Sequence, residues 1–378
     1  MLMAYNQVPI PSFMYGTAWK KDATTPLVQQ AVAAGFTAID TANQLIHYQE
    51  ALVGEALLEL AKQGTPRERL FIQTKFTPVN GQDHRTPYDA QADLTTQVKQ
   101  SFDSSLAHLH TDYLDSYVLH GPYARRGLSD ADWEVWAAIE ALYEARKTKM
   151  IGISNVSADQ LRLLCERAAH KPMVVQNRCY AALGWDQDVR EICRAHGIIY
   201  QGFSLLTANR DIFADPEVRA MAAKYGMGLA QLVFRFAMQV GMLPLTGTTN
   251  QEHMAEDLRS DQFTISSEDL QRLETAPRNG PCLKHPVAPP QHRVGNLPQV
   301  HIPRLFGHPP QDGVQTCEGC SQIVGRGHGC ITLAGCTLTR CQVIPCALLY
   351  PSGDRSGGPE GSPVPRPQAW TSRGSPGR

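Results

Sequence analysis

Asp40, Lys75 and His120 each stand at the carboxyl end of an apolar run that is typical of a buried strand. A carboxylate, an ammonium and an imidazole that meet in one pocket can hold and transfer protons. The parallel strands of a β/α barrel open their carboxyl ends on one face, so residues far apart in sequence converge there. The three residue types therefore predict acid/base chemistry at a site built from several strand ends. A fourth strand end, residues 152–155, adds polar groups to the same face.

The elements that must position these groups alternate between strand and helix as far as residue 276. We expect eight strands, at residues 13–16, 36–40, 70–75, 113–119, 150–154, 173–177, 198–203 and 243–246. We expect helices at residues 25–34, 48–63, 92–109, 130–145, 158–168, 186–195, 216–225 and 229–239, and another from residue 251. Eight such units favour an α/β fold of the (β/α)8 TIM barrel type over a doubly wound sheet. No Gly-x-Gly-x-x-Gly motif follows an early strand, which argues against a Rossmann fold.

The composition argues against membrane and nucleic-acid partners. No apolar run approaches the ~18 residues that a membrane span needs, and residues 1–12 lack a signal-peptide pattern. Residues 1–276 carry 25 Lys and Arg against 32 Asp and Glu, a mildly acidic balance that disfavours nucleic-acid binding. We expect a cytoplasmic protein that binds neither nucleic acid nor membranes, and we expect a monomer.

The chain changes character near residue 276. Residues 277–378 hold 16 of the 26 prolines and seven of the ten cysteines. Segments such as residues 286–290 and 357–361 are too rich in Pro and Gly to continue a helix or a central strand. We therefore predict two parts, a barrel domain at residues 1–276 and a mostly disordered Pro/Gly/Cys-rich tail at residues 277–378.

The cysteines of the tail allow two interpretations. Cys317-x-x-Cys320, followed by His328 and Cys330, could begin a zinc site. A single Cys-x-x-Cys without a second well-spaced pair is weak evidence for zinc, and a disordered segment favours free thiols. We expect no bound metal.

Several short segments of residues 8–275 match, in order and at strand ends, the pattern of a known family. The matching segments are Gly16-Thr17, residues 33–42, Thr74-Lys75, residues 115–122, residues 152–155, residues 175–177 and Phe203-Ser204. In these segments the chain resembles the aldo-keto reductases, whose barrels bind a nicotinamide cofactor without a Rossmann fold. The resemblance implies NAD(P)H-dependent reduction of small aldehydes or ketones to alcohols.

The resemblance assigns catalytic roles to Asp40, Lys75 and His120. Hydride addition to a carbonyl leaves an alkoxide that needs a proton, and a tyrosine hydroxyl, with a reference pKa of about 10, is a weak acid. A Lys ammonium nearby lowers that pKa, an Asp holds the Lys, and a His orients the carbonyl oxygen. Singly, each residue is better explained as a helix cap, a surface charge or a core histidine, but together they favour catalysis.

The tyrosine of the family pattern is not at its usual position. It normally lies five residues after the Asp, where this chain has Leu45. Counting back from the helix that contains Glu50 places His47 there, so the intervening loop is about two residues longer than usual. We predict that Tyr48 is the proton donor. His47, with an unperturbed pKa of about 6.5, is the alternative, and in a third case neither side chain reaches the site.

The resemblance also implies a nicotinamide site. Ser154, Asn155 and Gln176 match the residues that hold the carboxamide, and Phe203 matches the aromatic residue that stacks under the ring. Core packing is the competing explanation for Phe203. The other matching cofactor positions are Gly16 and Thr17 near the ribose, and Ser204 and Leu206 near the pyrophosphate.

The adenosine end departs from the family pattern. Gly247 and His253 replace the Lys and Arg that grip the 2′-phosphate, so a bidentate Arg fork is lost. Thr248 and the start of the helix from residue 251 can still receive a phosphate through backbone N–H groups. Asp257 stands where the family often has Asn. We name NADPH as the cofactor first, with NADH as the alternative.

Two functions remain open from the sequence. One is a reductase acting on small aldehydes or ketones. The other is a catalytically impaired barrel that binds cofactor and acts as a regulatory or interaction subunit. The proton donor separates them, because only the enzyme needs Tyr48 or His47 beside Lys75 and His120.

Overall fold

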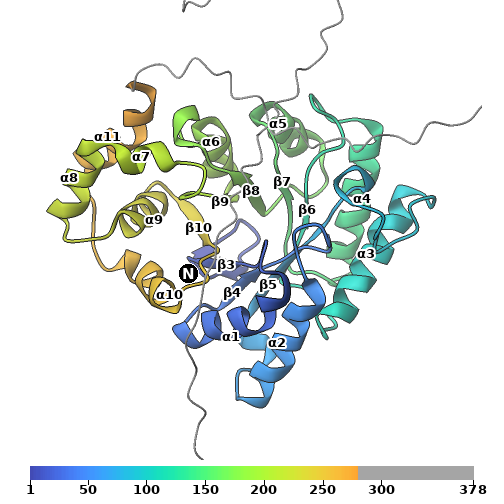
Figure 1. Cartoon of the computed structure of the whole chain (residues 1–378). Helices are drawn as coiled ribbons and strands as arrows, with labels where there is room; N and C mark the ends of the chain where they lie inside the picture. The colour runs from blue at the N-terminus through green and yellow to red at the C-terminus, as the bar shows by residue number, and fades with distance from the viewer. Residues whose placement is uncertain (280–378) are drawn as a thin grey trace, which may run out of the picture. The chain divides into compact units, whose positions relative to one another are not determined.

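Eight parallel strands close into a barrel in residues 1–279, the part of the chain that the computed structural model describes (Figure 1). The strands are β3 (Met14–Gly16), β4 (Ala38–Asp40), β5 (Phe71–Phe76), β6 (Ser116–Leu119), β7 (Ile151–Ser154), β8 (Val174–Arg178), β9 (Ile199–Phe203) and β10 (Met242–Thr246). Their order around the barrel follows the chain, and β10 closes it on β3 through the pairs Leu245–Met14 and Thr246–Tyr15. The predicted (β/α)8 TIM barrel is confirmed.

Helices surround the barrel (Figure 1). They are α1 (Thr24–Ala34), α2 (Glu50–Lys62), α3 (Leu94–His108), α4 (Asp130–Glu144), α5 (Ala158–Arg167), α6 (Gln187–His196), α7 (Arg210–Ala214), α8 (Pro216–Lys224), α9 (Leu229–Gln239), α10 (Gln251–Leu258) and α11 (Ser267–Asn279). Capping boxes at Ser129 and Ser157 start α4 and α5, because each serine and the third helical residue exchange hydrogen bonds.

One helix begins later than the sequence predicts, and the difference matters for the site. The pattern predicts a helix over residues 48–63, but α2 begins at Glu50. The backbone N–H of Tyr48 donates instead to the carbonyl oxygen of Gln44 in a turn. Tyr48 is therefore part of the loop between β4 and α2 rather than of the helix, and its side chain is placed by that loop.

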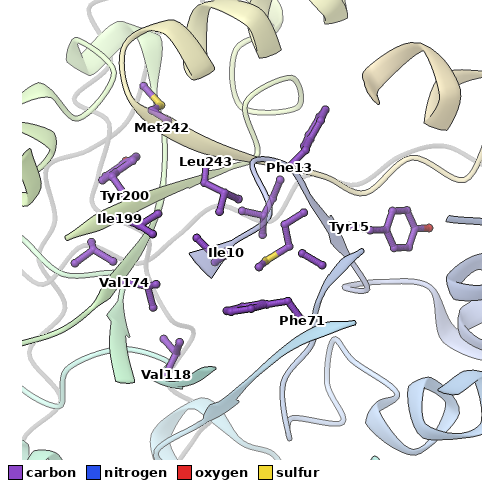
Figure 2. Close-up of a cluster of buried hydrophobic side chains, with 14 of the residues drawn as sticks. Ile10, Phe13, Tyr15, Phe71, Val118, Val174, Ile199, Tyr200, Met242 and Leu243 are labelled. Atoms are coloured by element: carbon purple, nitrogen blue, oxygen red, sulfur yellow. The ribbon is translucent and has the colours of Figure 1, made fainter. Parts of the chain in front are cut away.

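Apolar side chains fill the barrel and the layer under the helices (Figure 2). Phe13 packs edge-to-face against Phe36 and Phe234, and Ile10 is fully buried. Ile10 belongs to a short antiparallel hairpin, β1 (Leu2–Met3) with β2 (Pro9–Ile10), that the sequence pattern did not predict because each strand has only two residues.

This hairpin covers the amino end of the barrel. Tyr5 and Asn6, between its strands, hydrogen-bond to the carbonyl groups of Lys149, Lys171 and Gly197, which precede β7, β8 and β9. The carboxyl ends of the strands, where the predicted site residues lie, are at the opposite end. The sequence predicts the tail from residue 277, but residues 277–279 belong to the end of α11. The rest of the predicted disorder and the state of the tail cysteines concern residues 280–378, which lie outside the described part. No helix among the described residues is both long enough and apolar enough to cross a membrane.

Candidate active site

A cavity of about 870 Å³ opens at the carboxyl ends of the barrel strands. The predicted residues that line it are Gly16, Asp40, Tyr48, His120, Ser154, Asn155, Gln176, Phe203, Ser204, Leu206, Thr248 and His253. Two predicted residues lie beneath the cavity wall. Lys75 is fully buried, and Thr17 uses its hydroxyl and its N–H to donate to the carbonyl oxygen of Asp40.

A buried ion pair forms the floor of the cavity. Lys75 Nζ lies 2.7 Å from Asp40 Oδ1 and 2.8 Å from Oδ2, and also donates to the carbonyl oxygen of Thr41 at 2.7 Å. An ammonium has three N–H bonds, and all three are used here. Lys75 therefore acts on the cavity through its charge rather than as a free hydrogen-bond donor, and Asp40 balances most of that charge.

Three glutamines hold Asp40 from inside the barrel. The Nε2 atoms of Gln73 on β5 and Gln176 on β8 donate to Asp40 Oδ1 at 2.8 and 3.0 Å. Gln201 on β9 accepts from both amides and donates back to Gln73 Oε1 at 2.9 Å. All three amides are buried, so the carboxylate is fixed by donors from two other strands. Gln73 and Gln201 were missed, although a Gln inside an otherwise apolar strand is a detectable signal.

Tyr48 lies over this floor. Its ring meets the ring of His120 edge-on, with centroids 5.9 Å apart, and Lys75 Nζ is 5.2 Å from the centre of the Tyr48 ring. The longer loop after Asp40 therefore brings the ring of Tyr48 to the cavity, near both the imidazole of His120 and the ammonium of Lys75.

Burial controls the pKa of Tyr48. Loss of hydration raises the pKa of this phenol well above its ordinary value, and the carboxylate of Asp40 raises it further. The positive charge of Arg178 opposes both effects. The sequence argument expects the Lys75 ammonium to lower the pKa of Tyr48. The other effects outweigh it, because Asp40 neutralises the ammonium at hydrogen-bond distance.

His47 also lines the cavity, but farther out. Its ring packs at a tilt against the exposed ring of Trp19, with centroids 4.2 Å apart, and its carbonyl oxygen accepts from the backbone N–H of Trp19. Tyr48, by contrast, contacts both His120 and Lys75. The geometry therefore favours Tyr48 over His47 as the group nearest the ion pair.

Hydrogen bonds fix the orientation of His120. Its Nδ1 lies 2.7 Å from the hydroxyl of Thr77, and its carbonyl oxygen accepts from the side chain of Asn155 at 2.8 Å. The contact with Thr77 engages Nδ1 and fixes the plane of the imidazole ring at the cavity wall. Thr77 lines the cavity and was not among the predicted residues.

The wall between β7 and β9 carries two residues in left-handed backbone conformations. Asn155 has φ 53° and Ser204 has φ 57°, at the ends of β7 and β9. Such conformations are unfavourable for most side chains and gather at binding sites, where they orient polar groups. Ser154 and Asn155 are further linked by a hydrogen bond of 3.1 Å. These short polar side chains form a hydrophilic rim beside the apolar ring of Phe203.

The far end of the cavity has a cation that the sequence argument did not identify. Lys20, in the loop after β3, lines the cavity and donates to the carbonyl oxygen of Gly247. Partial burial lowers its pKa. At the start of α10, the side chain of Asn250 accepts from the N–H groups of Glu252 and His253. Those two N–H groups are therefore occupied and are less available to a phosphate than the sequence suggested.

Asp257 at this end makes the folding stability depend on pH. Burial raises the pKa of Asp257 to about 6, although a hydrogen bond from Thr246 opposes the rise. The unfolded chain has a pKa near 3.9 at this group, so the folded state binds the proton more tightly. The stability that this proton gives is complete below about pH 4 and is lost as the pH rises towards 6. The loss is about 2–3 kcal/mol.

We therefore expect Asp257→Asn to be more stable than the parent chain at pH 7.5 and equally stable near pH 4. Urea unfolding at both values measures this difference. Asp103→Asn, an exposed aspartate in the middle of α3, is the matched control and should change stability little at either pH. If the free energy of unfolding of Asp257→Asn differs from that of the parent chain by the same amount at both pH values, the assignment is contradicted.

Comparison with known proteins agrees with the fold. A model described as the aldo/keto reductase family matches residues 12–277. An aldo-keto reductase of Mycobacterium avium (strain 104) is 30% identical over 273 residues, covering 71% of this chain and 87% of the relative. A glyoxal reductase of Bacillus subtilis (strain 168) is 29% identical over 273 residues, covering 71% and 90%. A solved aldo/keto reductase from Brucella melitensis has a TM-score of 0.62 at 26% identity, covering 72% of this chain and 98% of that one.

Proposed function

The chain belongs to the aldo/keto reductase family, an oxidoreductase family that acts on carbonyl groups, and from this we propose that it reduces small aldehydes and ketones with NADPH. The observation that carries the proposal is the position of Tyr48, whose ring lies near both the ring of His120 and the Asp40–Lys75 ion pair. A relative named glyoxal reductase supports small aldehydes as the substrate class. We assign the activity to the barrel, residues 1–276, and treat residues 277–378 as a separate part.

The cavity fits a nicotinamide cofactor. It is long enough to run from the strand ends of β7 and β8 to the start of α10, and it offers an apolar ring, Phe203, beside amide and hydroxyl groups. Ser154, Asn155 and Gln176 would hold the carboxamide, Phe203 would stack under the ring, and Ser204 and Leu206 would meet the pyrophosphate. When bound, the cofactor supplies the hydride.

The protein's own groups handle the proton and the carbonyl oxygen. The imidazole of His120 donates to the carbonyl oxygen and holds it towards Tyr48. As hydride reaches the carbonyl carbon, the C=O π electrons move to oxygen, and the Tyr48 hydroxyl gives its proton to that oxygen. The phenolate that remains is stabilised by the positive charge of Arg178, which lowers the pKa of Tyr48, and it takes a proton from solvent. Asp40, held by Gln73 and Gln176, keeps Lys75 in place throughout.

The alternative function, an impaired barrel that only binds cofactor, is not favoured. It required that neither Tyr48 nor His47 reach the ion pair, whereas Lys75 Nζ lies 5.2 Å from the centre of the Tyr48 ring. The direct test is the full-length chain with NADPH and glyoxal, followed by loss of the reduced cofactor's absorbance and by identification of the alcohol. No turnover with glyoxal, simple aldehydes or simple ketones would refute the proposal.

Cofactor preference should be weak in the parent chain, because Gly247, just after β10, and His253, in α10, stand where the family pattern has a lysine and an arginine. We expect Gly247→Lys with His253→Arg to raise the ratio of kcat/KM for NADPH over NADH by about tenfold or more, since each new cation can add a charge-assisted bond to the 2′-phosphate. A side chain at Gly247 is tolerated, because its Cβ would meet only the flexible end of Lys20 at 3.3 Å and the Gly16 carbonyl oxygen at 3.6 Å.

The matched control for this double variant is Gly247→Met with His253→Gln, which adds similar bulk without charge. Its ratio should stay near that of the parent chain. If kcat/KM for NADH rises as much as kcat/KM for NADPH in the charged variant, the new cations do not contact a 2′-phosphate.

A further inference from the structure

Arg178 is an unbalanced cation in the wall of the cavity. It is the last residue of β8, its side chain is exposed, and it lines the cavity beside Gln176 and Phe203. Within residues 1–275 its guanidinium makes no hydrogen bond or ion pair, and its recorded contact is with the ring of Phe203, 5.3 Å from the ring centre. Some arginines of the barrel are paired with an acid, as Arg67 is with Asp115, but Arg178 is not, within the described residues.

The other charges around the catalytic end do not neutralise it. Asp40 is matched by Lys75 at 2.7 Å. The remaining acidic residues of the cavity wall, Glu256 and Asp257, belong to α10 at the adenosine end. The part of the cavity nearest the reacting groups therefore carries one net positive charge, presented by a planar side chain with several donors.

From this geometry we infer that Arg178 binds a carboxylate on the carbonyl substrate, so that the preferred substrates are oxo acids or aldehyde acids. The inference rests on the proposed carbonyl reduction. Phe203 is the residue proposed to stack under the nicotinamide, so a carboxylate held by Arg178 lies beside the hydride donor. The charge of Arg178 also reaches Tyr48, whose pKa it lowers, so the cation and the proton donor share one end of the cavity.

A carboxylate suits this site better than a phosphate. One guanidinium can bind one carboxylate through two parallel hydrogen bonds and balance its single charge. A phosphate dianion would keep an excess negative charge, because Lys75 is already committed to Asp40 and Thr41. Lys20, the other cation that lines the cavity, lies at the far end beside Gly247.

The test compares 4-formylbenzoate with 4-formylbenzamide, which have nearly the same shape and differ in charge. We expect the full-length chain to have a kcat/KM about 10- to 100-fold higher for the acid, the range of a hydrogen bond to a charged group. In Arg178→Met the ratio of the two values should fall to near one, and Arg178→Lys should retain part of it. Arg69→Met is the control, because Arg69 is exposed and lies at the opposite end of the barrel, before β5.

Two results would overturn the inference. One is a ratio near one in the parent chain, and the other is a ratio that survives in Arg178→Met. Calorimetric titration of the NADPH complex with 4-(hydroxymethyl)benzoate tests the same site without turnover, and its affinity should fall at least tenfold in Arg178→Met. If neither aldehyde is reduced, but 4-(hydroxymethyl)benzoate binds to the parent chain and binds at least tenfold more weakly to Arg178→Met, the carbonyl reductase proposal fails while the carboxylate site stands.

Discussion

Replacing Tyr48 by Phe should lower kcat for aldehyde reduction by about 10²–10⁴-fold, the range for loss of a positioned general acid. The ring of Tyr48 would stay in place, so its edge contact with His120 and its position near Lys75 would be kept. The substitution removes only the hydroxyl. NADPH affinity, measured by fluorescence titration, should therefore stay close to that of the parent chain, and KM should change far less than kcat.

His47→Ala is the matched control for this variant. His47 lines the same cavity from the same loop, but its ring packs on Trp19 nearer the exterior. We expect its effect on kcat to be within about tenfold, as for a group that shapes the cavity without donating the proton. If His47→Ala loses activity and Tyr48→Phe retains it, the imidazole is the donor. If both variants keep full activity, the proton comes from neither side chain.

The second large effect is on stability. Lys75→Met should destabilise the fold by about 3–5 kcal/mol, because it leaves a buried carboxylate without its cation. Asp40 is 3% exposed, and its remaining partners would be the neutral amides of Gln73 and Gln176. Urea unfolding measures the loss. The same variant should lose most of its activity, since the Tyr48 phenolate would face Asp40 without the balancing ammonium.

A second substitution separates charge from packing. In Asp40→Asn with Lys75→Met, no buried charge is left unpaired, so much of the lost stability should return while activity stays low. Lys62→Met, whose side chain is 70% exposed on α2, should change stability by no more than about 0.5 kcal/mol. A double variant that is no more stable than Lys75→Met alone would argue that the packing of the lysine chain, not its charge, holds this region.

The strands and the ion pair could be predicted because their signals are local. Each strand is a short apolar run, and Asp40 and Lys75 stand at the ends of two of them, so the barrel geometry alone brings them together. The loop after Asp40 could not be predicted in the same way. The helical spacing of apolar residues extends from α2 back to Tyr48, so the sequence predicts a helix from residue 48. In the structure Tyr48 belongs to a turn closed by Gln44, and the helix begins two residues later, at Glu50.

Lys20, Gln201 and Arg178 were missed for a different reason. Each owes its role to a neighbour that is distant in sequence: Gly247 for Lys20, Gln73 for Gln201, and Phe203 for Arg178. Such pairs depend on barrel closure, and residue type alone does not reveal them. Arg178 in particular stands one residue beyond the predicted end of its strand, where a surface charge is the ordinary expectation.

The reciprocal amide bonds between Gln73 and Gln201 impose an evolutionary constraint. Each side chain both donates to and accepts from the other, across a barrel interior that holds no other polar partner for Gln201 except Gln176 in the described residues. Changing Gln73 to an apolar residue removes the acceptor of the Gln201 amide, and changing both glutamines also removes a donor from Asp40 and an acceptor from Gln176. The two positions should therefore be inherited together with their partners, so that homologous sequences that keep the Asp40 carboxylate and the Gln176 amide also keep polar residues at both.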